Sequence, residues 1–479
     1  MAFRSARLRR EMPEKIAAYI SSLSFDHEIY QAVLVINAVH LKMLTRLGII
    51  SDRTLSRALE ALRKALENPL RLDDTRLEDV HMVVEEYLSR IVPEAGENLA
   101  LGKSRNDTVS TAIRMRAKEL CLHLCESAMT LVDRLLEKSL QNLETIYPAT
   151  THQQAAAPAT LGFILSSYAS RLLSTAENLK RIYEGLDLCP QGSAACCGST
   201  LPLDRNLLAQ QLGFSGVLEN ALEASSSRDF AVELAAASLR GLVVASDLVE
   251  HLIHDFTAGL LDIGDEFCST SSIMPQKRNP VVLEVLRTKA SEALGELVKI
   301  SSILQRRIGG YVLDLQQVTP AIWRLMRDAD QAFNVLADVM ESLDVNRDEA
   351  LRRCGLEVGM VELANYLVFR HGVGFRRAHR ACGELARILA EGGLSETALR
   401  EVLKKNGISE ALSIEEVRAI LSPQAIVSAY STSGSAKPSE VKRMVEAYRK
   451  RVSEIRDWIT KNRRLLEDVV ERAFSTQTG

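Results

Sequence analysis

Residues 268–289 read CSTSSIMPQKRNPVVLEVLRTK, a run of small hydroxyl side chains followed by a helical pattern. The hydroxyl run has neither a helical period nor an apolar alternation, so we expect a mobile loop there. Pro280 suits the first turn of a helix, because its missing N–H is not needed there, and Asn279 before it is a good N-cap. A polar loop therefore leads into the positive end of a helix and carries the Lys277-Arg278 pair. This arrangement favours an anion, and a surface loop with a solvated basic pair is the alternative.

The composition of the whole chain predicts a large helical protein. The chain has 479 residues, more than one compact domain usually holds, so we expect two or three domains. Only 12 residues are Pro and 5% are aromatic, while helix formers abound, which predicts a nearly all-α protein with few strands. Apolar positions at alternating steps of three and four, at 113–135 and 282–304, are typical of bundle seams. A long bundle often buries its remaining seam against copies of itself, so we expect a homo-oligomer.

Breaks between the helical patterns divide the chain into three predicted domains. These are an N-terminal helical domain at 1–105, a central long-helix bundle at 106–355 with the loop 268–280, and a C-terminal helical domain at 356–479.

Charge and cysteine content exclude several classes of protein. The net charge of −3 does not indicate a nucleic-acid or membrane surface. No stretch is long and apolar enough to span a bilayer, and no secretory signal follows the basic N-terminus. Eight scattered cysteines without a C-x-x-C pair favour reduced thiols, so we expect a cytoplasmic protein.

Two further polar segments stand at breaks between long helices. GKSRND at 102–107 opens a long helix, which Asn106 or Asp107 can cap, and this helix N-terminus also favours an anion. TTHQQ at 150–154 precedes a break that contains Pro and small residues.

Three other polar positions have ordinary structural alternatives. His81 lies off the apolar stripe of its predicted helix, so a surface histidine supported by Glu85 one turn later is possible. Asp26 can be the N-cap of the helix that begins near 27. The H-x-x-H-D pattern at 251–255 is a weak metal motif without a third ligand, and we interpret it as a helix surface.

The stretch SSIMPQKRNP resembles the signature loop of the fumarase/aspartase superfamily, Gly-Ser-Ser-x-Met-Pro-x-Lys-x-Asn-Pro, with Thr270 in place of Gly. Gln276 after the Pro resembles the argininosuccinate lyase branch. GKSRND at 102–107 resembles the Gly-Arg-Ser-Arg-Asn-Asp of that branch, and THQQ at 151–154 resembles its Thr-His-Leu-Gln. Further resemblances to this branch lie in SSLSFD, LEDVHMVVEEYL, SRDF at 227–230 and the Tyr311–Gln316 segment. The resemblance covers residues 20–440, nearly the whole chain.

This resemblance implies an all-α, three-domain homotetramer whose long helices form its core and whose active sites each combine segments from different subunits. It implies the reversible β-elimination of argininosuccinate to L-arginine and fumarate, a step of arginine biosynthesis, without a metal or organic cofactor. The partners are then a small-molecule substrate and copies of the chain. Adenylosuccinate lyase is the nearest rival, although that branch usually has His or Tyr at the position of Gln276. Fumarase, aspartase and a non-catalytic, crystallin-like protein on the same fold are further alternatives.

The resemblance assigns the elimination to four residues, Ser271, His152, Glu284 and Lys277. Ser271 would remove the proton next to a carboxylate, as an alkoxide stabilised by loop N–H groups and Lys277. The resulting aci-carboxylate needs preorganised donors and a cation, which Asn279 and Lys277 would supply. His152 would be the general acid or its organiser, and Glu284 would fix its tautomer.

The resemblance also assigns the residues that bind the substrate. It places Ser104, Asn106, Thr151 and Asn279 at the fumarate end, Ser22, Asp26, Tyr311 and Gln316 at the arginine end, and His81 and Arg105 elsewhere in the site. Asp26 would pair with a cationic amino group. Leu313 and Thr319 stand where the family has two lysines, one of which contacts the amino-acid carboxylate.

Overall fold

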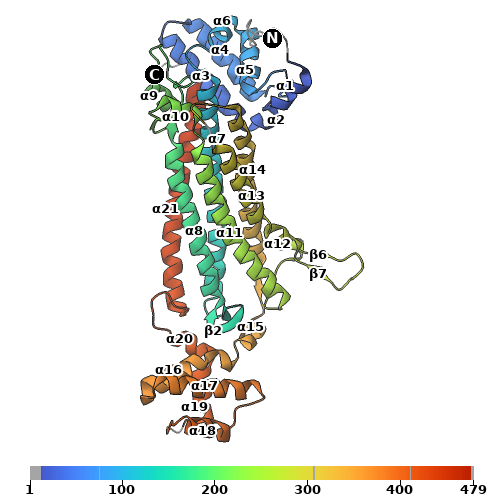
Figure 1. Ribbon diagram of the computed structural model, residues 1–479, viewed down its shortest axis with the longest axis vertical. Coiled ribbons are helices and arrows are strands. Elements are labelled where there is room, and N and C mark those ends of the chain that lie inside the picture. The colour runs from blue at the N-terminus through green and yellow to red at the C-terminus, as the bar shows by residue number, and fades with distance from the viewer. Residues whose placement is uncertain (1–11, 75, 306–307, 410–411, 476–479) are drawn as a thin grey trace.

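The computed structural model describes residues 12–74, 76–305, 308–409 and 412–475, and its elements confirm a mostly helical protein. Figure 1 shows an elongated molecule in which long helices run side by side as a bundle. The N-terminal helices cover one end of this bundle, and a smaller group of C-terminal helices lies beyond its other end. Within the described ranges, none of the helices combines the length and the apolar character that a membrane crossing requires.

The bundle is built around its longest helix, α7. Its main helices are α7 (Arg105–Gln141), α8 (Leu161–Leu186), α11 (Asp229–Thr257), α13 (Lys289–Leu304), α14 (Val318–Ser342) and α21 (Pro438–Ala473). α7 packs against α8, α14 and α21, and its seam residues Leu124, Ala128 and Leu131 are fully buried, which confirms the predicted seam. At 1.5 Å per residue, the 37 residues of α7 span about 55 Å.

α7 begins with a capping box. Ser104 is its N-cap: the Ser104 Oγ accepts a hydrogen bond from the Asn106 N–H at 3.3 Å. The Asp107 carboxylate in turn accepts a hydrogen bond from the Ser104 N–H at 2.8 Å. The prediction that Asn106 or Asp107 is the N-cap is therefore wrong, because both residues already lie inside the first turn.

Separate groups of helices occupy the two ends of the bundle. The N-terminal group comprises α1 (Glu14–Ile20), α2 (Leu23–Asp26), η1 (His27–Ile29), α3 (Tyr30–Arg46), α4 (Asp52–Glu67), α5 (Val80–Ile91) and α6 (Pro93–Asn98). The C-terminal group comprises η4 (Leu356–Gly359), α16 (Met360–His371), α17 (Phe375–Ala390), α18 (Glu396–Lys405), α19 (Ile414–Leu421) and α20 (Pro423–Ala429). Residues of the C-terminal group form a hydrophobic core of their own. The boundaries at 105 and 355 stay predictions.

The last helix returns from the C-terminal group to the bundle. α21 packs along α7 and α8, and its residues Val441 and Val445 belong to the core of the bundle. Arg451 on α21 forms an ion pair with Glu177 on α8 at 2.8 Å. We therefore propose that residues 438–473 belong with the bundle rather than with the C-terminal domain.

In the described part of the chain, four two-stranded sheets lie between the helices. They pair β1 (Ile146–Thr151) with β2 (Gln154–Thr160), β3 (Leu188–Cys189) with β4 (Gly216–Val217), β5 (Leu261–Asp262) with β8 (Asp344–Val345), and β6 (Ser269–Thr270) with β7 (Arg278–Asn279). The β3–β4 pair is parallel and the others are antiparallel. The remaining elements are η2 (Asp265–Phe267), η3 (Leu313–Gln317), α9 (Arg205–Gln211), α10 (Ala221–Ser226), α12 (Val281–Leu286) and α15 (Arg347–Arg353).

The stretch that resembles a signature loop forms a hairpin, β6–β7, which projects from the side of the bundle (Figure 1). Ser269 pairs with Asn279, so the predicted irregular loop is regular at its base, while its mobility stays a prediction. Asn279 is not the N-cap, because strand pairing holds its backbone in the hairpin. Pro280 takes the N-cap position of α12, without a side-chain hydrogen bond to that helix.

Candidate active site

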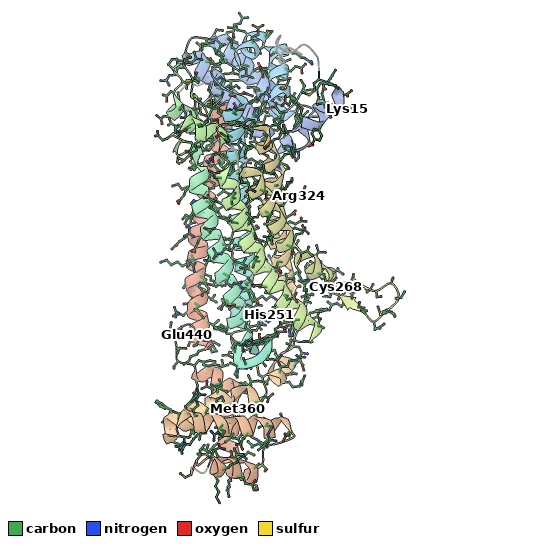
Figure 2. The ribbon with its side chains drawn as sticks, in the orientation of Figure 1. Lys15, His251, Cys268, Arg324, Met360 and Glu440 are labelled. Atoms are coloured by element: carbon green, nitrogen blue, oxygen red, sulfur yellow. The ribbon has the colours of Figure 1, made fainter. Side chains whose placement is uncertain are left out.

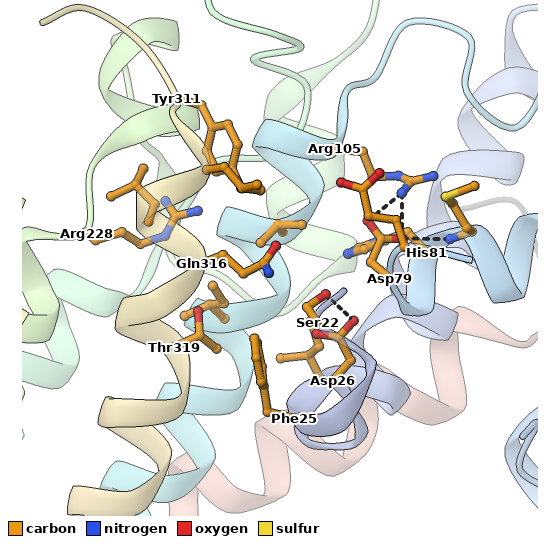
Figure 3. A pocket seen from close by; sticks show the side chains of 17 residues that line it. Ser22, Phe25, Asp26, Asp79, His81, Arg105, Arg228, Tyr311, Gln316 and Thr319 are labelled. Atoms are coloured by element: carbon orange, nitrogen blue, oxygen red, sulfur yellow. Dashed lines mark hydrogen bonds and ion pairs between the residues drawn. The ribbon is translucent and has the colours of Figure 1, made fainter. Parts of the chain in front are cut away.

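A pocket of about 270 Å³ lies where the N-terminal helices meet the bundle (Figure 3). The predicted site residues that line it are Ser22, Asp26, His81, Arg105, Tyr311 and Gln316. Other lining residues, to which the sequence analysis gave no role, include Phe25, Glu78, Asp79 and Arg228. The fold thus gathers six of the ten predicted substrate-binding residues, which lie in or next to α2, α5, α7 and η3.

Asp26 forms a buried acidic wall of this pocket. Its Oδ2 accepts hydrogen bonds from the Ser22 Oγ at 2.8 Å and from the Val80 N–H at 2.9 Å. Burial raises the pKa of Asp26 to about 6, and the two hydrogen bonds limit the rise. Asp26 stands at the N-cap position of η1, as the structural alternative predicted, but its side chain makes no capping hydrogen bond there and bonds to the start of α5 instead. A buried carboxylate with this pKa suits a cationic partner.

Arg105 is held by Asp79, whose pairing the sequence did not reveal. The Nη1 of Arg105 donates to both carboxylate oxygens of Asp79, and its Nη2 lies 3.6 Å from the Glu85 Oε2. Asp79 also caps α5 by accepting a hydrogen bond from the Met82 N–H at 2.8 Å. The resemblance of LEDVH to a family segment was the available signal, but it did not give Asp79 a partner on α7.

His81 is buried in the pocket wall. It is 6% exposed, so the alternative of a surface histidine supported by Glu85 is wrong. Burial lowers the pKa of His81 to about 3, which keeps the imidazole neutral. The Nε2 of His81 has no hydrogen-bond partner among the described residues. A neutral ring nitrogen in this position is available to a ligand.

Arg228 adds a second cation to the pocket. It is 1% exposed, and its Nη1 donates to the Ser110 Oγ at 3.1 Å. The resemblance of SRDF to Asp-Arg-Asp-Phe was the available signal in the sequence for this arginine. Leu313 and Thr319 also line the pocket, so both positions that lack a family lysine face this site. The cationic side chains among its lining residues are therefore those of Arg105 and Arg228.

Two predicted residues stand beside the pocket at the start of α7 without lining it. The Ser104 Oγ is engaged in the cap of α7. The Asn106 Nδ2 donates to the Ala195 carbonyl oxygen at 3.0 Å. Both residues are half-buried, and neither is among the residues that line the pocket.

Thr151 and His152 lie at the tip of the β1–β2 hairpin, and both are exposed. His152 has a φ of +53° and Gln153 a φ of +61°, which turn the chain between the two strands. This hairpin lies at the end of the bundle opposite to the pocket (Figure 1).

The β6–β7 hairpin carries Ser271 and Lys277. The Ser271 Oγ accepts hydrogen bonds from the Ile273 N–H at 3.3 Å and from the Met274 N–H at 3.1 Å. Two N–H groups directed at one oxygen favour negative charge on it. Lys277 and Glu284 are exposed, on the hairpin and on α12 respectively.

Within one chain these three groups of residues stay apart. The pocket lies at the N-terminal end of α7, and the β1–β2 hairpin follows its C-terminal end, about 55 Å away by the length of α7. The β6–β7 hairpin projects sideways from the bundle between them (Figure 1). A single chain therefore does not bring Ser271 or His152 to the pocket.

A buried polar cluster supports the β1–β2 hairpin. Asp255 on α11 accepts a hydrogen bond from the Tyr147 hydroxyl of β1, and its oxygens lie 2.8 Å from the His251 Nε2 and 2.8 Å from the His254 Nδ1. The His251 Nδ1 lies 3.1 Å from the Tyr168 hydroxyl. Figure 2 places His251 at the end of the bundle away from the N-terminal helices. The interpretation of this motif as a helix surface is wrong for Asp255, which is 3% exposed.

Within the described part of the chain, no group of three or more His, Cys, Asp or Glu side chains is arranged to hold a metal ion.

Comparison with known sequences gives matches over nearly the whole chain. The family described as lyase matches residues 7–295, and the family described as argininosuccinate lyase C-terminal matches residues 360–428. The argininosuccinate lyase of Methanothermobacter thermautotrophicus is 35% identical over 459 residues, which cover 93% of this chain and 98% of that protein. The argininosuccinate lyase of Methanoculleus marisnigri is 33% identical over 478 residues, which cover 98% of this chain and 96% of that protein.

Solved structures share the fold. EDDS lyase in complex with formate superimposes with a TM-score of 0.85 at 24% sequence identity, over 97% of this chain and 95% of that chain. The class II fumarase of Schistosoma mansoni gives a TM-score of 0.71 at 18% identity, over 83% of this chain and 90% of that chain. The architecture is therefore one that several lyases use.

Asp255→Asn tests the cluster behind the hairpin. Burial alone would raise the pKa of Asp255, but its hydrogen bonds with His251 and Tyr147 hold that pKa below its ordinary value. We expect the substitution to lower the free energy of unfolding by about 1–3 kcal/mol, because it weakens charge-assisted hydrogen bonds in a buried site. Because the pKa of Asp255 is depressed in the folded protein, its carboxylate stabilises the fold fully at neutral pH. This stabilisation is lost as the pH falls below about 4. Thermal unfolding of both proteins between neutral and acidic pH measures it.

The matched control is Asp247→Asn on the same helix. Asp247 pairs with Arg171 on the surface, where both side chains are about half exposed, so its loss should change stability by less than about 0.5 kcal/mol. Equal effects of the two substitutions would contradict a stabilising role of the cluster.

Proposed function

This chain belongs to the argininosuccinate lyase family of the fumarase/aspartase superfamily, and we propose that it converts argininosuccinate reversibly to L-arginine and fumarate. The observation that carries this conclusion is the similarity to argininosuccinate lyases along nearly the full length of both chains. The chain is thus a carbon–nitrogen lyase that acts on a small molecule, and we place it in the cytoplasm.

The proposed base is Ser271, which removes the proton next to a carboxylate of the succinyl group. A neutral hydroxyl is a weak base, so the alkoxide has to be stabilised. The hydrogen bonds that the Ser271 Oγ accepts from the Ile273 and Met274 N–H groups support this role. Lys277 on the same hairpin would add a positive charge beside the alkoxide and the developing aci-carboxylate, with Asn279 as a further donor.

The leaving nitrogen needs a proton, and His152 is the proposed acid or organiser of that step. Its position at the exposed tip of the β1–β2 hairpin suits a side chain that completes a site on another subunit. Glu284 on α12 would pair with it, fix its tautomer and favour its protonated form.

A homotetramer with shared active sites would unite the separated groups. The length of α7, about 55 Å, keeps the pocket and the His152 hairpin of one chain apart. Apolar side chains on three neighbouring helices also remain exposed in the single chain; they are Val243 on α11, Val285 on α12, and Leu294 and Val298 on α13. Packing of these helices against other copies would bury this surface.

The pocket is the proposed site for the arginine end of the substrate. Asp26 would pair with a cationic nitrogen, and Ser22, Tyr311 and Gln316 would surround it. Arg228 is the proposed partner of the amino-acid carboxylate, because the family lysines are replaced by Leu313 and Thr319.

The remaining predicted residues would hold the fumarate end. Ser104, Asn106 and Thr151 are proposed to bind its carboxylates, and Arg105 and the neutral His81 to contact the substrate elsewhere in the same site. Arg105 lines the pocket while it is paired with Asp79. It would therefore offer the substrate a positive charge in a fixed orientation.

Release of fumarate tests the function directly. We expect ultraviolet absorbance to report fumarate from argininosuccinate and none from adenylosuccinate. Ser271→Ala should lose at least about 10²–10⁴-fold in rate, because it removes the base of the proton transfer. Turnover of adenylosuccinate alone would overturn the substrate, and silence with both would overturn the proposed reaction.

Co-expression of two inactive variants tests the shared sites. Chains with Ser271→Ala and chains with His152→Asn should each be inactive, whereas mixed tetramers should recover activity at about a quarter of their sites. The control is a chain that carries both substitutions. Tetramers made only of this chain should stay inactive. Mixed tetramers without recovered activity would contradict sites shared between subunits.

The pH dependence of KM tests Asp26. Its pKa of about 6 means that the carboxyl group gains a proton and loses its charge as the pH falls through this value. KM for argininosuccinate should then rise by about tenfold per pH unit below 6, since the cationic end loses its partner. Asp26→Asn should raise KM at neutral pH and abolish this dependence. An unchanged pH profile of KM in Asp26→Asn would contradict the assignment.

A further inference from the structure

Two adjacent cysteines stand apart from the other thiols of the chain. Five of the eight cysteines are buried, whereas Cys197 is exposed and Cys196 is half-buried. The Sγ atoms of Cys196 and Cys197 lie 3.4 Å apart. The two thiols are therefore accessible to solvent and close enough to act on one reagent.

The loop that carries these cysteines is fastened to the first turn of α7. The Asp107 carboxylate accepts hydrogen bonds from the Gly192 N–H at 3.0 Å and from the Ala194 N–H at 2.9 Å. The carbonyl oxygen of Ala195, the residue before Cys196, accepts the hydrogen bond from the Asn106 Nδ2 at 3.0 Å. A displacement of the chain at Cys196 would therefore act on a proposed substrate-binding residue.

Cys196 also lies close to the segment that leads to Tyr311. A Cβ atom placed on Gly310 would lie 3.8 Å from the Cys196 Cβ, an ordinary van der Waals contact. Gly310 directly precedes Tyr311, which lines the pocket. Cys196 thus lies near two elements of the proposed site, the start of α7 and the segment before η3.

We propose that Cys196 and Cys197 form a dithiol modification site, which a small-molecule disulfide converts to a mixed disulfide and then to a Cys196–Cys197 disulfide. The Cys197 thiolate attacks one sulfur of the reagent, whose S–S bond breaks, and the departing thiolate takes up a proton. The Cys196 thiolate then attacks the Cys197 Sγ and releases the second half of the reagent as a thiol. In sum, two cysteine thiols lose two electrons and two protons, and the disulfide reagent is reduced to two thiols.

Local chemistry selects the attacking sulfur. The hydrogen bond between the two thiols raises the pKa of Cys196. Cys197 is also the more exposed of the two. Cys197 therefore attacks first and Cys196 resolves the mixed disulfide.

Modification should weaken substrate binding rather than remove catalytic groups. A bulky group on Cys197, or a bond between the two sulfurs, displaces Ala195 and with it the hydrogen bond to Asn106. We expect KM for argininosuccinate to rise severalfold while kcat changes less, and a dithiol reductant to restore KM. This effect on KM rests on the proposed function, whereas the reaction of the cysteines does not.

The experiment treats the full chain with oxidised glutathione and uses two readouts. Peptide mapping by mass spectrometry should find one glutathionyl group on Cys197, or the loss of two hydrogens from the Cys196–Cys197 peptide. Fumarate release should show the rise in KM and its reversal by dithiothreitol. Modification of Cys268 alone, or none, would overturn the proposal whether or not the chain releases fumarate.

Two variants separate this site from the remaining accessible thiol. Cys196→Ala/Cys197→Ala should keep the basal KM and become insensitive to oxidised glutathione, whereas Cys268→Ala should stay sensitive. Equal sensitivity of the double variant, or modification of the pair without any change in KM, would overturn the link to the pocket. An untreated chain that releases no fumarate would contradict the proposed function, while the peptide map would still decide the modification.

Discussion

A single buried carboxylate organises the start of α7, beside the proposed substrate pocket. Asp107 is inaccessible to solvent and accepts hydrogen bonds from the backbone N–H groups of Ser104, Gly192 and Ala194 at 2.8, 3.0 and 2.9 Å. Burial raises the pKa of Asp107 to about 6, and these three bonds oppose the rise. An unpaired buried polar group costs about 1–3 kcal/mol, so the three donors have to stay in place. The start of α7 and a distant loop are therefore held together, and Arg105 next to this turn points to the pocket.

The second constraint is the stiffness of α7. A helix of 37 residues converts a separation in sequence into a separation of about 55 Å in space. The pocket with Asp26 and Arg105 is thereby kept away from the hairpin that carries His152. Binding and proton transfer are assigned to different ends of one rigid element, so in the proposed tetramer the association of subunits and the formation of the active site are one event.

The charges around the pocket are balanced in a way that suits a substrate with charges of both signs. Asp26, Glu78 and Asp79 supply carboxylates, and Arg105 and Arg228 supply guanidinium groups. Each arginine has a hydrogen-bond acceptor in the protein, which fixes its direction before a ligand arrives. Preorganised charges of this kind are worth more in a buried pocket than in water, because the local dielectric constant is lower.

The sequence by itself determined the helical class, the bundle seam that contains Leu124 and Leu131, and six of the residues that line the pocket, namely Ser22, Asp26, His81, Arg105, Tyr311 and Gln316. Seams follow from local periodicity, and the site residues followed from short motifs that resemble those of a family. Only the tertiary structure decided that Asn279 pairs in a hairpin, that Asp255 is buried and that Asp79 holds Arg105. Asn279 pairs within a local hairpin that no apolar alternation marks, whereas Asp255 and Asp79 have partners on other elements, and none of these contacts leaves a periodic trace in the sequence.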